Sequence, residues 1–180
     1  MDKQYLSADD FYLDSFRLAK KIVDSGWRPD YIIALWRGGA PVGVCVHEFF
    51  QYCGIPAKHA VLKCSSYTGI ACKNDCVDFE NADSLFDAIP ATASVLFVDD
   101  VFDSGQTAAA VHSRFASRVS ELRFATVYWK PSKNTTSFNP DFHLRQTEEW
   151  IVFPHEMMGL DDKELAVKNP ALYKLLHEQA

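Results

Sequence analysis

The chain has 180 residues, which is enough for one domain of ordinary size and too short for two. Hydrophobic residues make up 48% of the sequence and aromatic residues 13%, and this composition excludes a disordered chain. The net charge of −6 at neutral pH argues against a dedicated nucleic-acid binder and against an anionic membrane as partner.

Two further features concern the compartment. No apolar run approaches the roughly 20 residues of a membrane span, and the N-terminal sequence MDKQYLSADD lacks the layout of a signal peptide. We therefore expect a cytoplasmic protein. The five cysteines are an odd number, so reduced thiols are expected rather than a disulfide framework. Cys64, Cys72 and Cys76 form a cluster to which only His59 could add a fourth ligand, but their spacings match no standard zinc pattern.

Helices and strands are predicted to alternate along the chain. The helical periodicity that starts after the capping residue Ser7 ends at Gly26, and residues 94–98 are the clearest buried strand. The predicted elements in chain order are a helix over 8–25, strands over 31–35 and 57–63 separated by a helix over 41–53, an aperiodic stretch over 64–82, a strand over 94–98, a helix over 107–118, a strand over 122–129, weaker strands over 142–145 and 149–153, and a helix opened by Asn169-Pro170.

This alternation predicts an α/β fold in which helices flank a central, mainly parallel sheet. Ligands of such sheets bind outside the carboxyl ends of the strands, where the loops converge. The loops expected at that edge are Arg37-Gly38-Gly39 and residues 99–107. The stretch over 64–82 is long for a loop in a compact domain, and such a loop is usually functional or mobile.

The segment VLFVDDVFDSGQT, residues 95–107, carries the most specific chemistry. The adjacent carboxylates Asp99 and Asp100 can accept hydrogen bonds from a vicinal diol, or hold Mg²⁺ through its waters. The turn Ser104-Gly105-Gln106-Thr107 offers backbone N–H groups, hydroxyls and a helix N-terminus, which suit a phosphate monoester. A ribose phosphate would therefore fit along this loop. The alternative is ordinary turn chemistry after a strand.

Taken together, these residues closely resemble the phosphoribosyl-pyrophosphate (PRPP) signature of the type I phosphoribosyltransferases. The resemblance implies that Asp99 and Asp100 bind the ribose and associate with Mg²⁺, directly or indirectly, and that residues Ser104, Gly105, Gln106 and Thr107 bind the 5′-phosphate. It also implies that Asp103 accepts the N7 proton of a purine and is the catalytic residue.

Two other segments resemble loops of the same family. Residues 32–39, IIALWRGG, are similar to its pyrophosphate-binding loop, where the peptide bond before the basic residue is commonly cis. This implies that Arg37 and Gly38 bind pyrophosphate, a task that suits the planar, permanently charged guanidinium. Trp36 stands where a small or aliphatic residue is usual. The sequence from Cys64 resembles the start of the mobile catalytic loop, which implies that Ser66 and Tyr67 close over the reacting centre; the alternative is a surface loop without a role in catalysis.

The segments VYWKP and EWIVFP, at residues 127–131 and 149–154, resemble those of members that use guanine, xanthine or hypoxanthine. The resemblance implies that Lys130 donates to the purine O6, and that Trp150 and Ile151 cover the base. The alternatives are a solvated Lys130 and a Trp150 in the core. His155-Glu156 departs from the second aromatic and acid that often follow, so the preferred base stays open.

The resemblance covers residues 30–156 and implies one phosphoribosyltransferase domain over 1–180, with a base-covering hood over about 140–160 and a terminal helix over about 160–180. The implied activity is the transfer of ribose 5-phosphate from PRPP to a 6-oxopurine in purine salvage, with release of pyrophosphate. It implies Mg²⁺ as cofactor, strongly magnesium-dependent PRPP binding, and a homo-oligomer, dimer or tetramer. Two alternatives remain: a non-catalytic sensor of PRPP or nucleotides, and a phosphoribosyltransferase for a pyrimidine or adenine.

Overall fold

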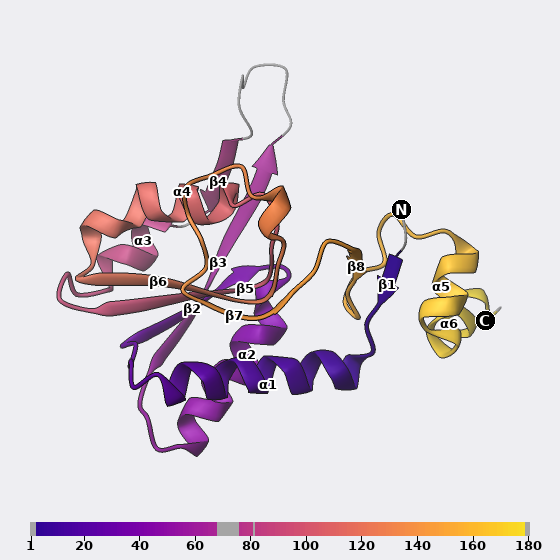
Figure 1. Cartoon of the computed structure of the whole chain (residues 1–180), viewed down its shortest axis with the longest axis horizontal. Coiled ribbons are helices and arrows are strands. Elements are labelled where there is room, and N and C mark those ends of the chain that lie inside the picture. The colour runs from indigo at the N-terminus through magenta and orange to yellow at the C-terminus, as the bar shows by residue number, and fades with distance from the viewer. Residues whose placement is uncertain (1–2, 68–75, 81, 179–180) are drawn as a thin grey trace. The chain divides into compact units, whose positions relative to one another are not determined.

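The computed structural model describes residues 3–67, 76–80 and 82–178. Within these ranges no helix combines the length and the apolar character that a membrane span requires. The chain divides into two compact units, one formed by residues 14–148 and the other by the residues up to Leu13 together with those from Glu149 onward. Figure 1 shows the elements of both units along the chain.

A six-stranded sheet forms the centre of the larger unit. The strands lie in the order β4–β3–β2–β5–β6–β7, and all neighbours are parallel except the pair β3–β4. Their bounds are Tyr31–Trp36 (β2), Lys58–Tyr67 (β3), Cys76–Glu80 (β4), Ser94–Phe102 (β5), Glu121–Trp129 (β6) and Phe142–Gln146 (β7). The predicted α/β class, with a mainly parallel central sheet flanked by helices, is confirmed.

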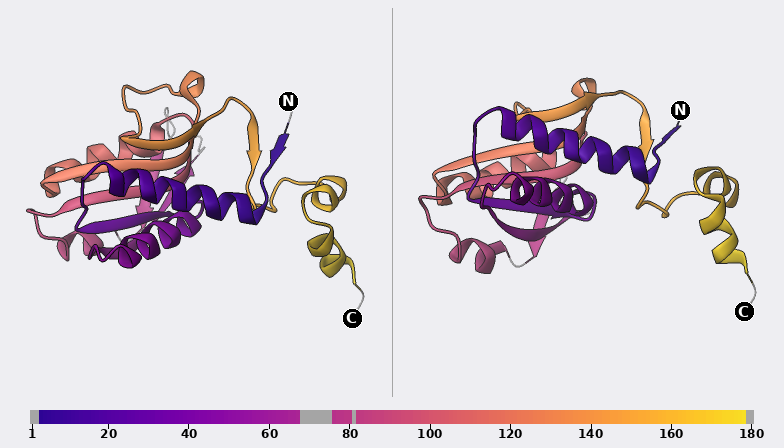
Figure 2. Two further views of the ribbon diagram at one scale, coloured as in Figure 1. Left: turned by 60° about the horizontal axis from the view of Figure 1, so that its bottom comes forward. Right: turned by 90° about the horizontal axis from the view of Figure 1, so that it is seen from below.

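Helices cover both faces of this sheet (Figures 1 and 2). On one face lie α2 (Gly39–Tyr52) and the part of α1 (Ala8–Asp24) that belongs to this unit, and on the other lie α3 (Ala82–Asp87) and α4 (Gln106–Phe115). The core under α3 and α4 is aromatic, and the rings of Phe86 and Phe115 stack with their centroids 4.0 Å apart. Residues Val95–Val98 of β5 are completely buried, as the apolar run predicts for a central parallel strand.

The order of the strands creates a switch point between β2 and β5. From β2 the chain passes through α2 to β3 on one side, whereas from β5 it passes through α4 to β6 on the other. Register pairs Ala34 of β2 with Val98 of β5, so the residues that follow these two positions meet at the same edge. In open parallel sheets the ligand-binding crevice lies outside the carboxyl ends of the strands at such a point.

The region expected to be an aperiodic loop over 64–82 is partly a hairpin. Strand β3 continues to Tyr67 and pairs with β4 in antiparallel register, from Lys63 opposite Glu80 to Tyr67 opposite Cys76. Lys63 Nζ donates to Glu80 Oε1 at 2.5 Å, so an opposite-charge pair supports this register. Residues 68–75 lie outside the described part of the chain, as do the side chains of Ser66 and Tyr67.

The smaller unit pairs the two ends of the chain. Strand β1 (Lys3–Tyr5) runs parallel to β8 (Trp150–Val152). Instead of the single terminal helix expected over about 160–180, there are two, α5 (Asp162–Lys168) and α6 (Pro170–His177). Asn169 separates them: it ends α5, and its side chain accepts a hydrogen bond from Leu172 N at 3.0 Å to cap α6. The proline that follows cannot continue α5, because it has no N–H group.

Candidate active site

The loop after β2 packs directly against the end of β5. A Cβ atom on Gly39 would lie 2.3 Å from the Val98 carbonyl oxygen, and one on Gly38 would lie 2.3 Å from Asp100 Oδ2. Neither position can therefore carry a side chain without a shift of its neighbour. Gly38, which is predicted to bind pyrophosphate, and the neighbouring Gly39 thus allow the two loops to come together.

Asp99 and Asp100 lie inside β5, because the strand extends to Phe102 rather than ending at Val98 as predicted. Successive side chains of a strand point to opposite faces. Asp100 accordingly lies against Gly38, whereas Asp99 lines a small cavity of about 80 Å³ on the side of Ser104. The two adjacent carboxylates thus face the two different loops.

The two carboxylates at this edge of the sheet favour the binding of a positively charged group. Burial, and then the negative charge of Asp100, raise the pKa of Asp99 well above its usual range. Cys64, at the same edge, contacts the Trp36 carbonyl oxygen with its Sγ atom at 3.7 Å. Burial and the nearby charges of Asp99 and Asp100 raise the pKa of this thiol to about 11, so it stays protonated at neutral pH.

The turn from Ser104 to Thr107 combines a left-handed glycine with the start of α4. Gly105 has φ of +80°, which favours glycine, and a Cβ atom there would lie 2.5 Å from both Asn134 Oδ1 and Thr136 Oγ1. It is also the N-cap residue of α4 and has no side chain to cap the helix. The first N–H groups of a helix have no partner within the helix, so an anion suits this position.

Asp103 and Lys130 form an ion pair. Lys130 Nζ lies 3.1 Å from Asp103 Oδ2, and the lysine is only 4% exposed although it follows the last residue of β6. The Lys130 backbone N–H also donates to the Phe102 carbonyl at 2.9 Å. The sequence predicted that both residues bind the purine, and the structure shows them in contact with each other. The alternative of a solvated lysine is wrong.

Arg37 extends from the first loop into solvent. Its side chain is exposed, and among the residues that the structure describes none pairs with its guanidinium group. The peptide bond between Trp36 and Arg37 is cis, as the resemblance implies, although Trp36 departs from the usual residue type. A cation (Arg37), two carboxylates (Asp99 and Asp100) and the N-terminus of α4 thus lie at the switch point between β2 and β5.

Comparison with protein families identifies the chain. The model of the phosphoribosyl transferase domain matches residues 2–162. The chain belongs to the phosphoribosyltransferase family. The match spans every residue of the larger unit and part of the smaller one. The comparison with curated proteins finds no match.

Solved structures similar to this phosphoribosyltransferase carry the same fold. A purine phosphoribosyltransferase from Pyrococcus horikoshii is 29% identical and aligns over 89% of this chain and 99% of its own, with a TM-score of 0.69. A hypothetical protein from Neisseria gonorrhoeae with bound ppGpp is 18% identical over 94% and 97%, with a TM-score of 0.75. The hypoxanthine phosphoribosyl transferase of Trypanosoma cruzi is 17% identical over 80% and 77%, with a TM-score of 0.65.

The other predicted site residues of the phosphoribosyltransferase lie in other parts of the chain. Trp150 and Ile151 belong to β8 in the smaller unit; the indole of Trp150 is 48% exposed, whereas Ile151 is buried. The alternative of a Trp150 in the core is therefore wrong. Ser66 and Tyr67 end β3, which places their backbone in a strand that ends at the same edge as β2.

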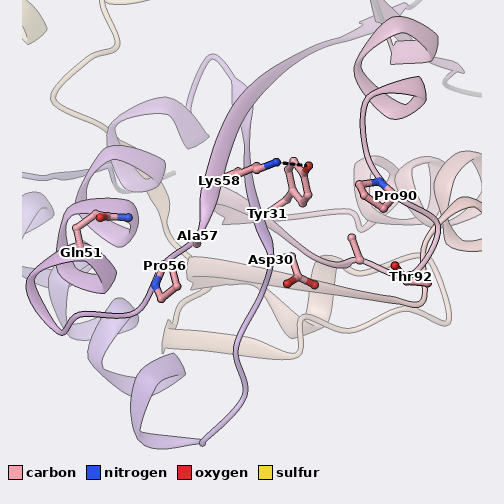
Figure 3. Close-up of a pocket in the computed structure, with 9 residues that line it drawn as sticks. Asp30, Tyr31, Gln51, Pro56, Ala57, Lys58, Pro90 and Thr92 are labelled. Carbon is pink, nitrogen blue, oxygen red and sulfur yellow. Dashed lines mark hydrogen bonds between the residues drawn. The ribbon is translucent and has the colours of Figure 1, made fainter.

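One cavity lies far from this site along the strands. It has a volume of about 510 Å³ and opens where β2 and β3 begin (Figure 3). Its charged groups already have partners: Lys58 Nζ donates to the Tyr31 hydroxyl at 3.3 Å, and Asp30 Oδ2 accepts hydrogen bonds from Ser94 N and Oγ at 2.8 and 2.9 Å. Because parallel sheets bind ligands at the carboxyl ends of their strands, the candidate active site is the opposite edge.

Sequence reasoning missed the residues that support the turn after β5. Asn134, Thr135 and Thr136 lie close behind it, and Thr135 N donates to the Ser104 carbonyl at 2.9 Å. The available signal was the polar run from Asn134 to Ser137, a composition typical of turns whose side chains bond to nearby backbone. Nothing in the sequence indicates which loop this run contacts.

Proposed function

We propose that this phosphoribosyltransferase transfers ribose 5-phosphate from PRPP to N9 of a 6-oxopurine and releases pyrophosphate. The observation that carries the proposal is the ion pair of Lys130 and Asp103, at 3.1 Å, beside the loop assigned to the sugar phosphate. A 6-oxopurine offers an acceptor, O6, next to a donor, N7–H. Lys130 offers the matching donor and Asp103 the matching acceptor, so the base can replace the contact between them. Adenine would instead direct an amino group at the ammonium group.

PRPP has three parts that suit three neighbouring groups of residues. The exposed Arg37 and the glycine backbone suit the pyrophosphate, the carboxylates of Asp99 and Asp100 suit the ribose hydroxyls, and the start of α4 suits the 5′-phosphate. These assignments agree with those that the resemblance implies for Gly38 and for residues 104–107.

The chemistry of Asp99 and Asp100 fits a magnesium ion. The two carboxylates supply hard oxygen donors, and burial together with the negative charge of Asp100 raises the pKa of Asp99, an effect that a bound cation would counteract. Among residues 3–67, 76–80 and 82–178 no group of three or more acidic, histidine or cysteine side chains could enclose a metal ion. Asp99 and Asp100 would therefore hold Mg²⁺ together with water and substrate oxygens. The ion, when bound, neutralises charge on the pyrophosphate.

The reaction replaces one bond at the anomeric carbon by another. The C1–O bond to pyrophosphate breaks, the C1–N9 bond forms with inversion, and the N7 proton passes to the Asp103 carboxylate. Because such displacements develop oxocarbenium character, catalysis consists mainly of holding both reactants in line and stabilising the departing charge, a role that suits the exposed guanidinium of Arg37. Lys130 holds O6 and so orients the base.

The remaining assignments complete the proposal. Ser66 and Tyr67 close over the reacting centre, as the family resemblance implies, and exclude water that would hydrolyse the sugar donor. The family resemblance also assigns Trp150 and Ile151 to purine binding. The enzyme acts in the cytoplasm in purine salvage and forms a homo-oligomer.

A second candidate function is a nucleotide sensor without catalytic activity. It is favoured by one observation, the similarity to a protein whose structure holds ppGpp. A ribose that carries two diphosphate groups presents phosphates on both sides of the sugar, as PRPP does, so the same two loops suit it. A phosphoribosyltransferase for another base is the other alternative, and the same experiment separates all three.

The test incubates the purified protein with PRPP, Mg²⁺ and one base at a time: guanine, xanthine, hypoxanthine, adenine or uracil. Nucleotide and pyrophosphate are measured. We expect turnover with at least one 6-oxopurine, none without Mg²⁺, and none with adenine or uracil. Binding of PRPP without pyrophosphate release from any base would instead identify a sensor. In Asp103→Asn, turnover should fall by about 100-fold while PRPP affinity changes by less than about threefold; normal turnover of this variant would show that Asp103 is not the base.

A further inference from the structure

The segment that follows β6 contacts the turn after β5 at several points. We call residues 130–139 the brace. Thr135 holds the Ser104 carbonyl with two donors, its backbone N at 2.9 Å and its Oγ1 at 3.2 Å. The same Oγ1 accepts a hydrogen bond from Gln106 Nε2 at 3.1 Å. One threonine thus uses both the donor and the acceptor capacity of its hydroxyl on this turn.

Fixing the Ser104 carbonyl also fixes the next amide. In a trans peptide the C=O and the following N–H point in opposite directions. Because the Ser104 carbonyl points at Thr135, the Gly105 N–H points away from the brace. An N–H group at a helix start that is held in one direction can bind an anion without the cost of ordering it first.

Asn134 and Thr136 fill the space beside Gly105. Asn134 Oδ1 accepts hydrogen bonds from Thr136 N and Oγ1, both at 2.9 Å, and Asn134 Nδ2 donates to the Phe138 carbonyl at 2.6 Å. Both ends of the amide are therefore engaged within the brace. The brace therefore presents a fixed surface to Gly105, and a Cβ atom on Gly105 would not fit against this surface.

The brace is attached at both of its ends. At one end the Lys130 backbone N–H donates to the Phe102 carbonyl at 2.9 Å, next to the ion pair with Asp103. At the other end the Phe138 ring packs against His112 of α4, with ring centroids 4.7 Å apart. The turn from Asp103 to Gln106 is therefore held between two fixed points.

We infer that Thr135 is a positioning residue for the 5′-phosphate of PRPP and of the nucleotide product. It acts through Ser104 and Gly105, whose amide it directs, and the inference rests on the proposed assignment of that phosphate to residues 104–107. Thr135 is assigned to one subsite alone, because within residues 3–67, 76–80 and 82–178 its hydrogen bonds lie on the turn after β5 and none lies on the loop after β2.

The experiment measures the binding of two ligands, each of which contacts only one of the two loops in the proposed site. Guanosine 5′-monophosphate reports the turn after β5, and magnesium pyrophosphate reports the loop after β2. Three variants are compared with the wild type by calorimetry and by steady-state kinetics. Thr135→Val keeps the shape but loses the hydroxyl, Thr135→Ser keeps the hydroxyl, and Thr92→Val is the matched control in the distant cavity (Figure 3).

Thr135→Val should raise the Kd for guanosine 5′-monophosphate and the KM for PRPP by about three- to tenfold, because the loss of the hydroxyl removes hydrogen bonds to both Ser104 and Gln106. Its Kd for pyrophosphate and its kcat at saturating PRPP should stay within about twofold of the wild type. Thr135→Ser should restore both phosphate-dependent constants, and Thr92→Val should change none.

Each other outcome overturns the inference in a recognisable way. If the wild type binds guanosine 5′-monophosphate and Thr135→Val binds it equally well, Thr135 does not position the phosphate, and the proposed function stands. If Thr135→Val weakens both ligands alike, or Thr135→Ser fails to restore binding, the effect is general loosening of the fold. If the wild type binds neither PRPP nor the nucleotide, the proposed function fails and the inference with it.

Discussion

The two loops at the carboxyl edge of the sheet both bring backbone close to a neighbour, but different partners hold them. After β2, Gly39 packs against main chain, with the Val98 carbonyl oxygen 2.3 Å from where a Cβ atom would lie. After β5, Gly105 packs against the side chains of Asn134 and Thr136. The first loop is therefore fixed by the sheet itself, and the second by the brace.

The loops also differ in how they can attract phosphate. The first loop carries Arg37, an exposed cation without a partner in the described part of the chain. The turn Ser104–Thr107 carries no cation and offers hydroxyls, amides and the start of α4. Ligand binding at the first loop should be sensitive to loss of the Arg37 charge, whereas binding at a subsite built from directed N–H groups should be sensitive to the geometry of the turn.

The largest expected effect is that of Gly39→Ala. Its new methyl group would meet the backbone of β5, which cannot move without disrupting the sheet, so we expect a loss of about 3 kcal/mol of stability and at least about 100-fold of kcat/KM. The control is Gly54→Ala. Gly54 has φ of +69° but open space around it, so only the backbone conformation should cost about 1 kcal/mol, with normal activity. Urea denaturation and PRPP kinetics measure both; equal losses in the two variants would contradict the steric argument.

Gly105→Ala should have the next largest effect, and Gly26→Ala is its matched control. Both glycines have φ of +80°, but Gly26 has no atom within 4 Å of the added Cβ, whereas Gly105 faces Asn134 Oδ1 and Thr136 Oγ1 at 2.5 Å. We expect the PRPP KM of Gly105→Ala to rise by about 30-fold, since the turn must move off the brace. Gly26→Ala should lose only the stability that the strained backbone costs. A PRPP KM equal in the two variants would show that the brace does not shape this subsite.

Arg37→Gln tests the opposite loop by removing charge without adding bulk. The Kd for magnesium pyrophosphate should rise by about tenfold, because hydrogen bonds from a charged donor are lost. The Kd for guanosine 5′-monophosphate should change by less than about twofold, and the melting temperature should not change, because the side chain is exposed. This is the reverse of the pattern expected for Thr135→Val. Weaker binding of both ligands would mean that the two subsites are not independent.

The sequence predicts this edge of the sheet well because its signals are local. The buried run at 94–98 and the glycines after β2 depend on neighbouring residues only, and the structure places both as expected. The end of β5 was predicted too early, because two aspartates are unusual in a strand and pairing with β6 overrides their preference. The β3–β4 hairpin and the brace were missed because both depend on partners distant in sequence. No local pattern specifies that Thr135 meets Ser104, 31 residues earlier.

Asp99→Asn should have a small effect on stability, opposite in sign to the losses expected for the glycine variants. Burial and the charge of Asp100 raise the pKa of Asp99 in the folded state above its value in the unfolded state. Above about pH 4 the folded protein therefore binds more protons than the unfolded protein does. Stability due to this group is therefore lost as the pH rises through the folded pKa. Asparagine carries no charge, so Asp99→Asn should melt about 2 to 4 °C above the wild type at pH 8, and the two proteins should converge at acidic pH, where Asp99 is protonated.

The same variant should lose activity while it gains stability, because the carboxylate that destabilises the free enzyme is the one assigned to ribose and Mg²⁺. Magnesium with PRPP should raise the melting temperature of the wild type more than that of Asp99→Asn, since the wild type has one more carboxylate whose charge the cation can offset. Thermal unfolding across pH 4 to 8, with and without these ligands, measures both effects. A variant that melts below the wild type at pH 8 would show that Asp99 supports the fold at this edge, and that its charge is not held there for the ligand.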